Sequence, residues 1–201
     1  EEMIDAGIHV VIASGNDGVK IDLPGGPDYN NYFIDDYNDL VYYNRGSSPY
    51  SFRAINVGAL DTTPFDIGHD RKVDFSEGGP GVDIYTAGYA IMSATSNTNT
   101  FVEEGYSDAA YYLNADYKQA NLSGTSMASP QACGLAALIL QINNNAKPVE
   151  LKQYVVNLAT DSMYASFTDN NYTDLNDTWG GPPVVFYNRF NSPISLTIRT
   201  V

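Results

Sequence analysis

The sequence predicts an α/β protein built on a mostly parallel sheet. Short, continuous apolar runs, typical of strands buried on both faces, alternate with longer segments of helical pattern, and turn residues separate the two kinds of segment. With 201 residues, 43% of them hydrophobic, the chain is long enough to bury one sizeable core. We therefore expect one domain rather than two.

The first elements are a short helix and a buried strand. Residues 1–6 have a helical pattern that Gly7 closes, but no N-cap residue precedes it, so we interpret this segment as a cut helix. Polypeptide upstream of Glu1 is then missing, cleaved or assigned to another chain. Residues 8–13 predict a strand, and the turn 14–18 follows it. Further strands are expected at Ala54–Leu60, Val82–Thr86 and Ile91–Thr95.

Two helices are expected in the second half of the chain. The apolar segment Met127–Ile142 predicts a buried helix, and Cys133, the only cysteine, is expected to be buried inside it. The next helix should begin at Pro148, because apolar residues then recur at the spacing of one helical face: Leu151, Tyr154, Val155 and Leu158. Residues 161–201 are expected to form a loop-rich extension ending in a strand at 194–201.

Charge and hydropathy exclude several function classes. The net charge of −14 and a pI near 4.2 would repel nucleic acids and anionic membrane surfaces. The longest apolar run, Ala132–Leu140, is much shorter than the roughly 20 residues of a membrane-spanning helix.

The segment Gly124–Pro130 carries the strongest functional signal. It places Ser126 at the start of the predicted apolar helix, where free N–H groups and the helix dipole stabilise negative charge, so Ser126 is a candidate nucleophile. By itself the segment would rather be interpreted as an ordinary helix start in which Ser126 is the N-cap. Asn16 ends the first strand and could donate a second hydrogen bond to an oxyanion, although alone it would be interpreted as a turn residue.

Taken together, residues 10–18 and 122–130 resemble the motifs of the subtilisin-like serine proteases, the subtilases. Residues 54–60, 73–76 and 82–88 between them are also similar to that family. The resemblance covers residues 1–160 and implies the C-terminal half of a three-layer αβα catalytic domain. It implies that Ser126 is the nucleophile, that Asn16 binds the oxyanion and that the substrate lies against Ala13, Ser14, Gly15, Gly124 and Thr125.

The family's catalytic aspartate and histidine have no counterpart in this sequence. Subtilases place these residues before the serine, so both are expected upstream of Glu1, on an N-terminal half that would be this chain's partner. His9 is expected to be a core or sheet-edge residue, and His69 a surface loop residue. Without a base Ser126 is not activated, and we expect the chain alone to be inactive and to fold poorly.

Two long segments extend the family's plan. The acidic, tyrosine-rich segment Val19–Tyr50 and the segment Ser96–Ala120 are predicted insertions that could restrict substrate access or bind other subunits of an assembly. No cofactor is expected to be required. Because subtilases commonly bind calcium, a structural calcium ion is conceivable at the carboxylates of the first insertion, although solvated loop charge explains these residues better: Asp22, Asp28, Asp35, Asp36 and Asp39.

The leading hypothesis is an extracellular or virion-associated serine endopeptidase acting on polypeptides. One alternative is a catalytically silent structural protein, for example of a phage virion, that keeps the fold as a scaffold. Another is a virion protease that processes itself and then remains as structure.

Overall fold

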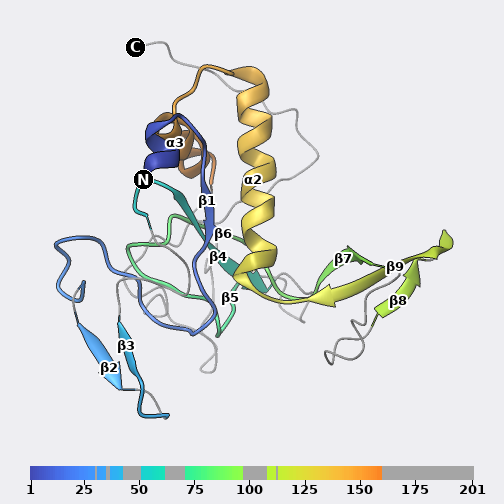
Figure 1. Cartoon of the computed structure of the whole chain (residues 1–201), viewed down its shortest axis with the longest axis horizontal. Coiled ribbons are helices and arrows are strands. Elements are labelled where there is room, and N and C mark those ends of the chain that lie inside the picture. The colour runs from blue at the N-terminus through green and yellow to red at the C-terminus, as the bar shows by residue number, and fades with distance from the viewer. Residues whose placement is uncertain are drawn as a thin grey trace.

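The fold is centred on strand β4 (Ile55–Asp61), every residue of which is buried (Figure 1). The computed structural model describes residues 1–29, 31–34, 37–42, 51–61, 71–96, 108–111 and 113–159. Two strands flank β4 in parallel, β1 (Val11–Ala13) and β6 (Ile84–Ala87), whereas the short β5 (Arg71–Lys72) pairs antiparallel with its end. This arrangement confirms the predicted α/β class and the mostly parallel sheet.

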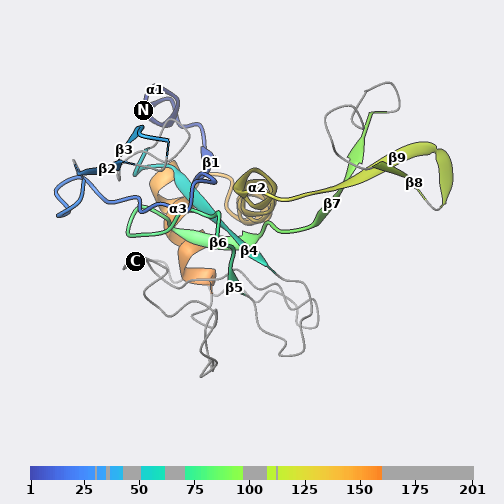
Figure 2. The same cartoon turned by 90° about the horizontal axis from the view of Figure 1, so that it is seen from below.

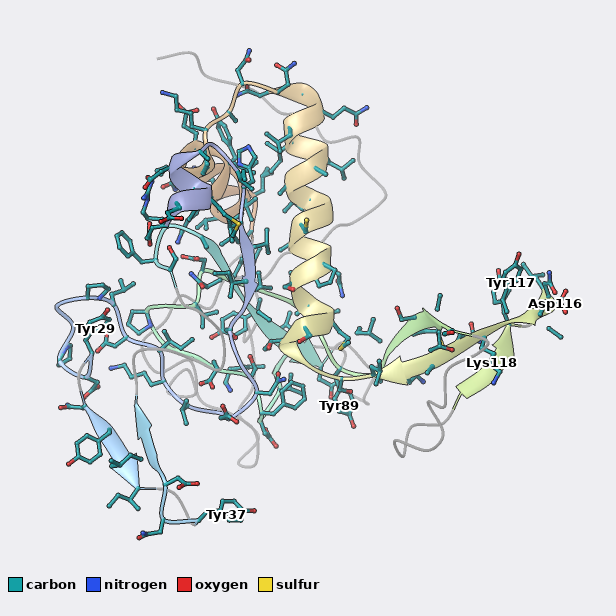
Figure 3. All side chains as sticks on the ribbon, in the orientation of Figure 1. Tyr29, Tyr37, Tyr89, Asp116, Tyr117 and Lys118 are labelled. Carbon is teal, nitrogen blue, oxygen red and sulfur yellow. The ribbon has the colours of Figure 1, made fainter. Side chains whose placement is uncertain are left out.

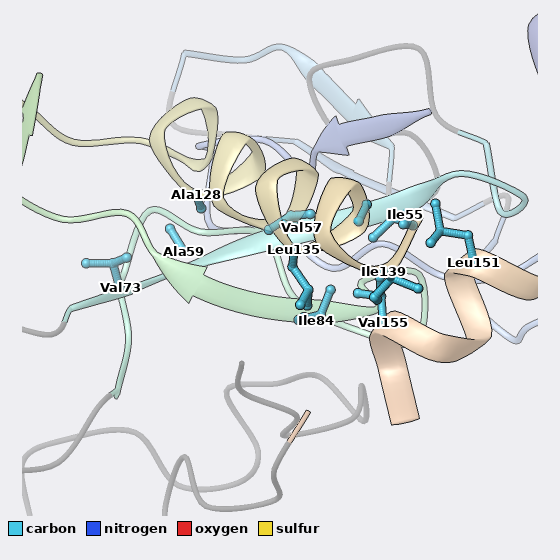
Figure 4. Close-up of a cluster of buried hydrophobic side chains, with 12 residues drawn as sticks. Ile55, Val57, Ala59, Val73, Ile84, Ala128, Leu135, Ile139, Leu151 and Val155 are labelled. Carbon is cyan, nitrogen blue, oxygen red and sulfur yellow. The ribbon is translucent and has the colours of Figure 1, made fainter. Parts of the chain in front are cut away.

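The two faces of the sheet bury different clusters, because successive side chains of a strand point to opposite faces. On one face, Ile55 and Val57 of β4 pack with Ile84 of β6 beneath two helices (Figure 4). On the other face, Leu60 and Tyr85 pack with Ile21 and Val82. The segment that follows β1 therefore covers the face of the sheet opposite the helices.

Two helices, α2 (Thr125–Ile142) and α3 (Pro148–Leu158), form the layer on the first face, and the short α1 (Glu2–Asp5) lies near α3 (Figures 1 and 2). The predicted apolar face of α3 is confirmed, since Leu151 and Val155 are fully buried in the same cluster as β4. The carboxylate of Glu150 accepts a hydrogen bond from the Lys147 N–H (2.9 Å) and closes the first turn of α3.

Helix α2 buries only one side, although its sequence is apolar almost all round. Six residues at helical spacing are buried: Thr125, Ala128, Ala132, Leu135, Ala136 and Ile139. The opposite side is exposed, including Leu138 (48%) and Ile142 (56%). The prediction that Cys133 is buried is wrong, because Cys133 lies on this exposed side. Composition cannot show which sides of an apolar helix have neighbours.

The two predicted insertions contain further strands, which project from the sheet in opposite directions (Figures 1 and 2). In the first, β2 (Tyr32–Ile34) and β3 (Leu40–Tyr42) form an antiparallel hairpin. In the second, β8 (Asp108–Tyr111) and β9 (Asn114–Leu122) join β7 (Ile91–Thr95) in a three-stranded antiparallel sheet, here called the arm. Figure 3 shows Tyr37 near the far end of the hairpin and Tyr117 near the far end of the arm, and both are exposed.

Most element boundaries agree with the sequence prediction to within three residues. The strand predicted at residues 91–95 is confirmed at both ends, whereas the one predicted from residue 8 begins at Val11. The predicted tail, with its strand at 194–201, lies outside the described residues. In the part of the chain that the structure describes, no helix has the length and apolar character needed to cross a membrane.

Candidate active site

The amino end of α2 lies at the carboxyl ends of the parallel strands. The Gly124 N–H donates to the carbonyl of Gly88, just after β6 (2.8 Å), and the Thr86 hydroxyl donates to the Ala128 carbonyl (2.7 Å). A Cβ on Gly88 would lie 2.5 Å from the Cβ of Ala59, so only glycine lets the turn before α2 come this close to the sheet. In open parallel sheets, ligand sites usually form at this end of the strands.

Ser126 is the second residue of α2 and is exposed. Its N–H is one of the first four of the helix, which have no acceptor within the helix. Negative charge that develops beside Ser126 is therefore stabilised by a backbone donor and by the helix dipole. The alternative that Ser126 caps the helix is wrong, because the N-cap is Gly124 and Ser126 is already inside the helix.

Asn16 follows β1, and its side-chain amide is oriented by Thr125. The Asn16 Oδ1 accepts hydrogen bonds from the Thr125 N–H (2.9 Å) and from the Thr125 hydroxyl (3.0 Å). The Nδ2 points toward Gly124, 3.6 Å from where a Cβ on that glycine would lie. Because its oxygen already holds two donors, the amide presents its NH2 group as a donor at the amino end of α2, the end that carries Ser126.

Thr125 also fixes the loop that carries Asn16. Its hydroxyl oxygen accepts the Gly15 N–H (3.2 Å), and the residue is 1% exposed. The Thr125 side chain therefore faces this loop and bonds to both Gly15 and Asn16. Gly15 has φ +124°, a backbone conformation that favours glycine.

The other predicted substrate-contacting residues lie around this turn. Ala13 is half-buried, and Ser14 and Gly124 are buried. The Ser14 N–H donates to the Val57 carbonyl (3.0 Å), continuing the pairing between β1 and β4. The structure thus brings Ser126 and Asn16 to one end of the sheet together with the five predicted substrate-contacting residues: Ala13, Ser14, Gly15, Gly124 and Thr125.

Among the described residues, the one histidine, His9, does not lie beside Ser126. His9 is half-buried and precedes β1, whereas Asn16 follows the opposite end of that strand. The five residue steps from His9 to Ser14 cover roughly 16 Å at about 3.3 Å per step, so His9 lies far from the end of β1 that leads to Asn16, beyond the reach of proton transfer there. His69 lies outside the described residues.

A buried carboxylate lies directly behind the Asn16 loop, and the sequence did not single it out. Glu77 is 0% exposed, and its carboxylate accepts the N–H groups of Val19 (2.8 Å) and Asp17 (3.4 Å). Burial raises the pKa of Glu77 to about 8, an effect that these two donors partly offset. The one signal in the sequence was a charged residue next to the recognised segment 73–76.

Two carboxylates of the first insertion lie beside a lysine, whereas Asp35 and Asp36 lie outside the described residues. The Lys20 ammonium lies 3.4 Å from the Asp22 carboxylate and 2.6 Å from that of Asp28, and it lowers the pKa of Asp28. Among the described residues, no group of three histidine, cysteine, aspartate or glutamate side chains converges as a metal site.

Comparison with known proteins identifies a relationship over most of the chain. The model of the subtilase family matches residues 1–180. The serine protease AprX of Bacillus subtilis is 33% identical over 164 residues, which are 78% of this chain and 31% of that protein. A subtilisin-like protease of Coccidioides posadasii is 31% identical over 157 residues, which are 78% of this chain and 28% of that protein. The chain thus spans less than a third of these relatives.

A solved structure supports the fold. The crystal structure of a cold adapted subtilisin-like serine proteinase superposes on this chain with a TM-score of 0.55 at 23% identity. The match covers 92% of this chain and 47% of the other. The chain therefore has the architecture of roughly half of that structure.

Proposed function

Because this chain belongs to the subtilase family, we propose that it carries the nucleophile and the oxyanion-binding part of a serine endopeptidase. The observation that carries the proposal is the orientation of Asn16. Thr125 holds its amide oxygen with two donors, so the NH2 group is presented at the amino end of the helix that bears Ser126.

The proposed reaction is acyl transfer through Ser126. The serine Oγ attacks the carbonyl carbon of a peptide bond while a histidine takes its proton. The Asn16 Nδ2 and the Ser126 N–H stabilise the oxyanion of the tetrahedral intermediate. The histidine then protonates the leaving amine, an acyl-enzyme remains on Ser126, and water hydrolyses it.

We assign the histidine and its aspartate to an N-terminal segment that packs on this chain. Two features of the described residues support this partner. Strand β1 pairs only with β4 there, so its other edge presents unpaired N–H and C=O groups. Helix α2 exposes Leu138 and Ile142 on the side away from the core. A further strand and helix would cover both features.

The proposal includes an extracellular or virion-associated location and polypeptide substrates, and no cofactor takes part in the chemistry. A structural calcium ion is an addition that chelation can test. If calcium contributes, EDTA should lower the melting temperature, and added calcium should restore it.

Labelling with a fluorophosphonate tests the proposed function. The polypeptide with its N-terminal segment should form an adduct on Ser126, located by peptide mass mapping, and Ser126→Ala should abolish it. The 201-residue chain alone should react far more slowly, because it lacks the base. If the longer polypeptide gives no adduct where AprX reacts, the structural-protein alternative is correct instead.

A further inference from the structure

Glu77 is bonded to the residues on both sides of Asn16. Its backbone N–H donates to the carbonyl of Gly15 (3.2 Å), and its carboxylate accepts the N–H of Asp17. The same carboxylate accepts the N–H of Val19, which lies two residues further along. One buried side chain and its own peptide group thus determine the path of the loop that presents the Asn16 amide.

The segment around Glu77 is itself rigidly attached to the sheet. The Ser76 hydroxyl accepts the Ala59 N–H (2.9 Å) and donates to the Glu77 carbonyl (3.0 Å). The buried Lys72 ammonium donates to the carbonyls of Ser76 (2.7 Å) and Val73 (3.1 Å). Strand β4 therefore fixes Ser76 and Glu77 in place, and Glu77 in turn fixes the loop that carries Asn16.

We propose that Glu77 is a positioning residue for the oxyanion site, which it controls by holding the 15–19 loop. The inference rests on the proposed protease function. Glu77 does not contact substrate, since it is fully buried, and it acts only through the placement of Asn16.

The charge state of Glu77 decides how well it holds the loop. Both oxygens of an ionised carboxylate are strong acceptors for the two N–H donors, whereas protonation turns one of them into a hydroxyl, which holds its donor more weakly. The charged groups that act on it are the Asp17 carboxylate, which raises the pKa, and the Lys72 ammonium, which lowers it. Because this pKa is about 8, the loop should tighten as the pH rises from 7 to 9.

Kinetics of the polypeptide with its N-terminal segment test this role through Glu77→Gln. Glutamine resembles the protonated carboxyl, so the variant should match the wild type at pH 6. At pH 9 it should have a roughly tenfold lower kcat with KM nearly unchanged, because small displacements of a catalytic group cost about this much or more. Equal kcat values at pH 9 would overturn the proposal.

A double-mutant cycle separates positioning from general destabilisation. If Glu77 acts through Asn16, Glu77→Gln should lower kcat at pH 9 much less when Asn16 is already alanine. Additive losses would overturn the proposal. The matched control is Asp83→Asn at the amino end of β6, where burial also raises the pKa and the carboxylate accepts the Asn56 N–H (2.8 Å). This control should lower the melting temperature without changing kcat.

A spectroscopic readout keeps the two proposals distinguishable. In a Ser126→Ala background, the amide proton shifts of Asp17 and Val19 should titrate near pH 8, and Glu77→Gln should remove this titration. If the titration is absent, Glu77 does not hold the loop, even in an active protease. If it is present and the wild type cleaves no peptide, the protease function fails and the loop contact stands.

Discussion

At the site, Thr125 determines the orientation of the Asn16 amide. Replacing Asn16 with alanine should lower kcat by about 10² to 10³, the usual cost of losing an oxyanion donor. Thr125→Val removes the hydroxyl that bonds Asn16 Oδ1 and Gly15, and we expect a roughly tenfold lower kcat, because one of two restraints on the amide remains. Steady-state kinetics on the polypeptide with its N-terminal segment measure both effects.

The chain offers a matched control for the threonine. Thr86→Val also removes a buried hydroxyl bond, here to the Ala128 carbonyl, at a cost of about 1 kcal/mol in stability. It should leave the Asn16 amide in place and kcat nearly unchanged. A similar kcat for Thr125→Val and the wild type would show that the Thr125 hydroxyl is not needed to orient Asn16.

Glu77 should also make stability depend on pH. The pKa of Glu77 is about 8 in the folded state and has its ordinary value of 4.5 in the unfolded state. Between pH 4.5 and about 8, the folded state therefore keeps a proton that the unfolded state releases. The stabilising effect of this proton is complete below pH 4.5 and is lost as the pH rises to about 8. Urea unfolding should show a decline of a few kcal/mol over this range, at about 1.4 kcal/mol per pKa unit, that Glu77→Gln reduces. Parallel pH profiles for the two proteins would contradict this assignment.

Single residues were predictable from the sequence only where a motif contained them. The paired motifs located Ser126 and Asn16 at one site. They could not assign Thr125 to the support of Asn16, because that role depends on a hydrogen bond between residues 109 positions apart. Glu77 was missed because burial of a carboxylate follows from tertiary packing, which a local pattern does not contain.

Among the elements, the junction between β6 and α2 is the most sensitive to added volume. Gly88→Ala would place a methyl group 3.0 Å from the Gly124 carbonyl oxygen and closer still to Ala59, so the turn before Ser126 must shift. We expect a loss of about 1–3 kcal/mol in unfolding free energy and much slower fluorophosphonate labelling.

The control for Gly88→Ala is Gly134→Ala in the middle of α2. A Cβ at Gly134 has no neighbour within 4 Å, and alanine favours a helix by roughly 1 kcal/mol over glycine. This variant should be as stable as the wild type or more stable, with unchanged labelling. Equal rates of fluorophosphonate labelling for Gly88→Ala and Gly134→Ala would show that the turn before Ser126 tolerates the added methyl group.

The strands and helices of the core were predictable because their apolar runs are long and have clear boundaries. The strand β4 and the helices α2 and α3 were identified in this way. The strands β8 and β9 of the arm and both strands of the hairpin were not identified. The sequences of β8 and β9 mix polar and apolar residues without a regular alternation, and β2 and β3 are only three residues long. Their pairing partners, rather than their own composition, make them strands.

For the whole molecule, the surfaces of the sheet and of α2 that no described residue covers should determine whether it self-associates. In the part of the chain that the structure describes, β1 has a free edge and α2 exposes Leu138 and Ile142. These features should cause the 201-residue chain alone to self-associate at micromolar concentrations. Light scattering after size-exclusion chromatography should show this, and Leu138→Lys with Ile142→Lys should reduce it. A strictly monomeric chain would indicate that neither feature needs a partner.

The exposed position of Cys133 makes α2 open to direct chemical observation. It is the only thiol of the sequence, so a maleimide dye or spin label attaches at one known point on the uncovered side of the helix. Arrival of an N-terminal segment would slow alkylation of the thiol and shift the emission of an attached dye. A single natural side chain thus allows assembly of the two halves to be timed in solution, without engineering a reporter.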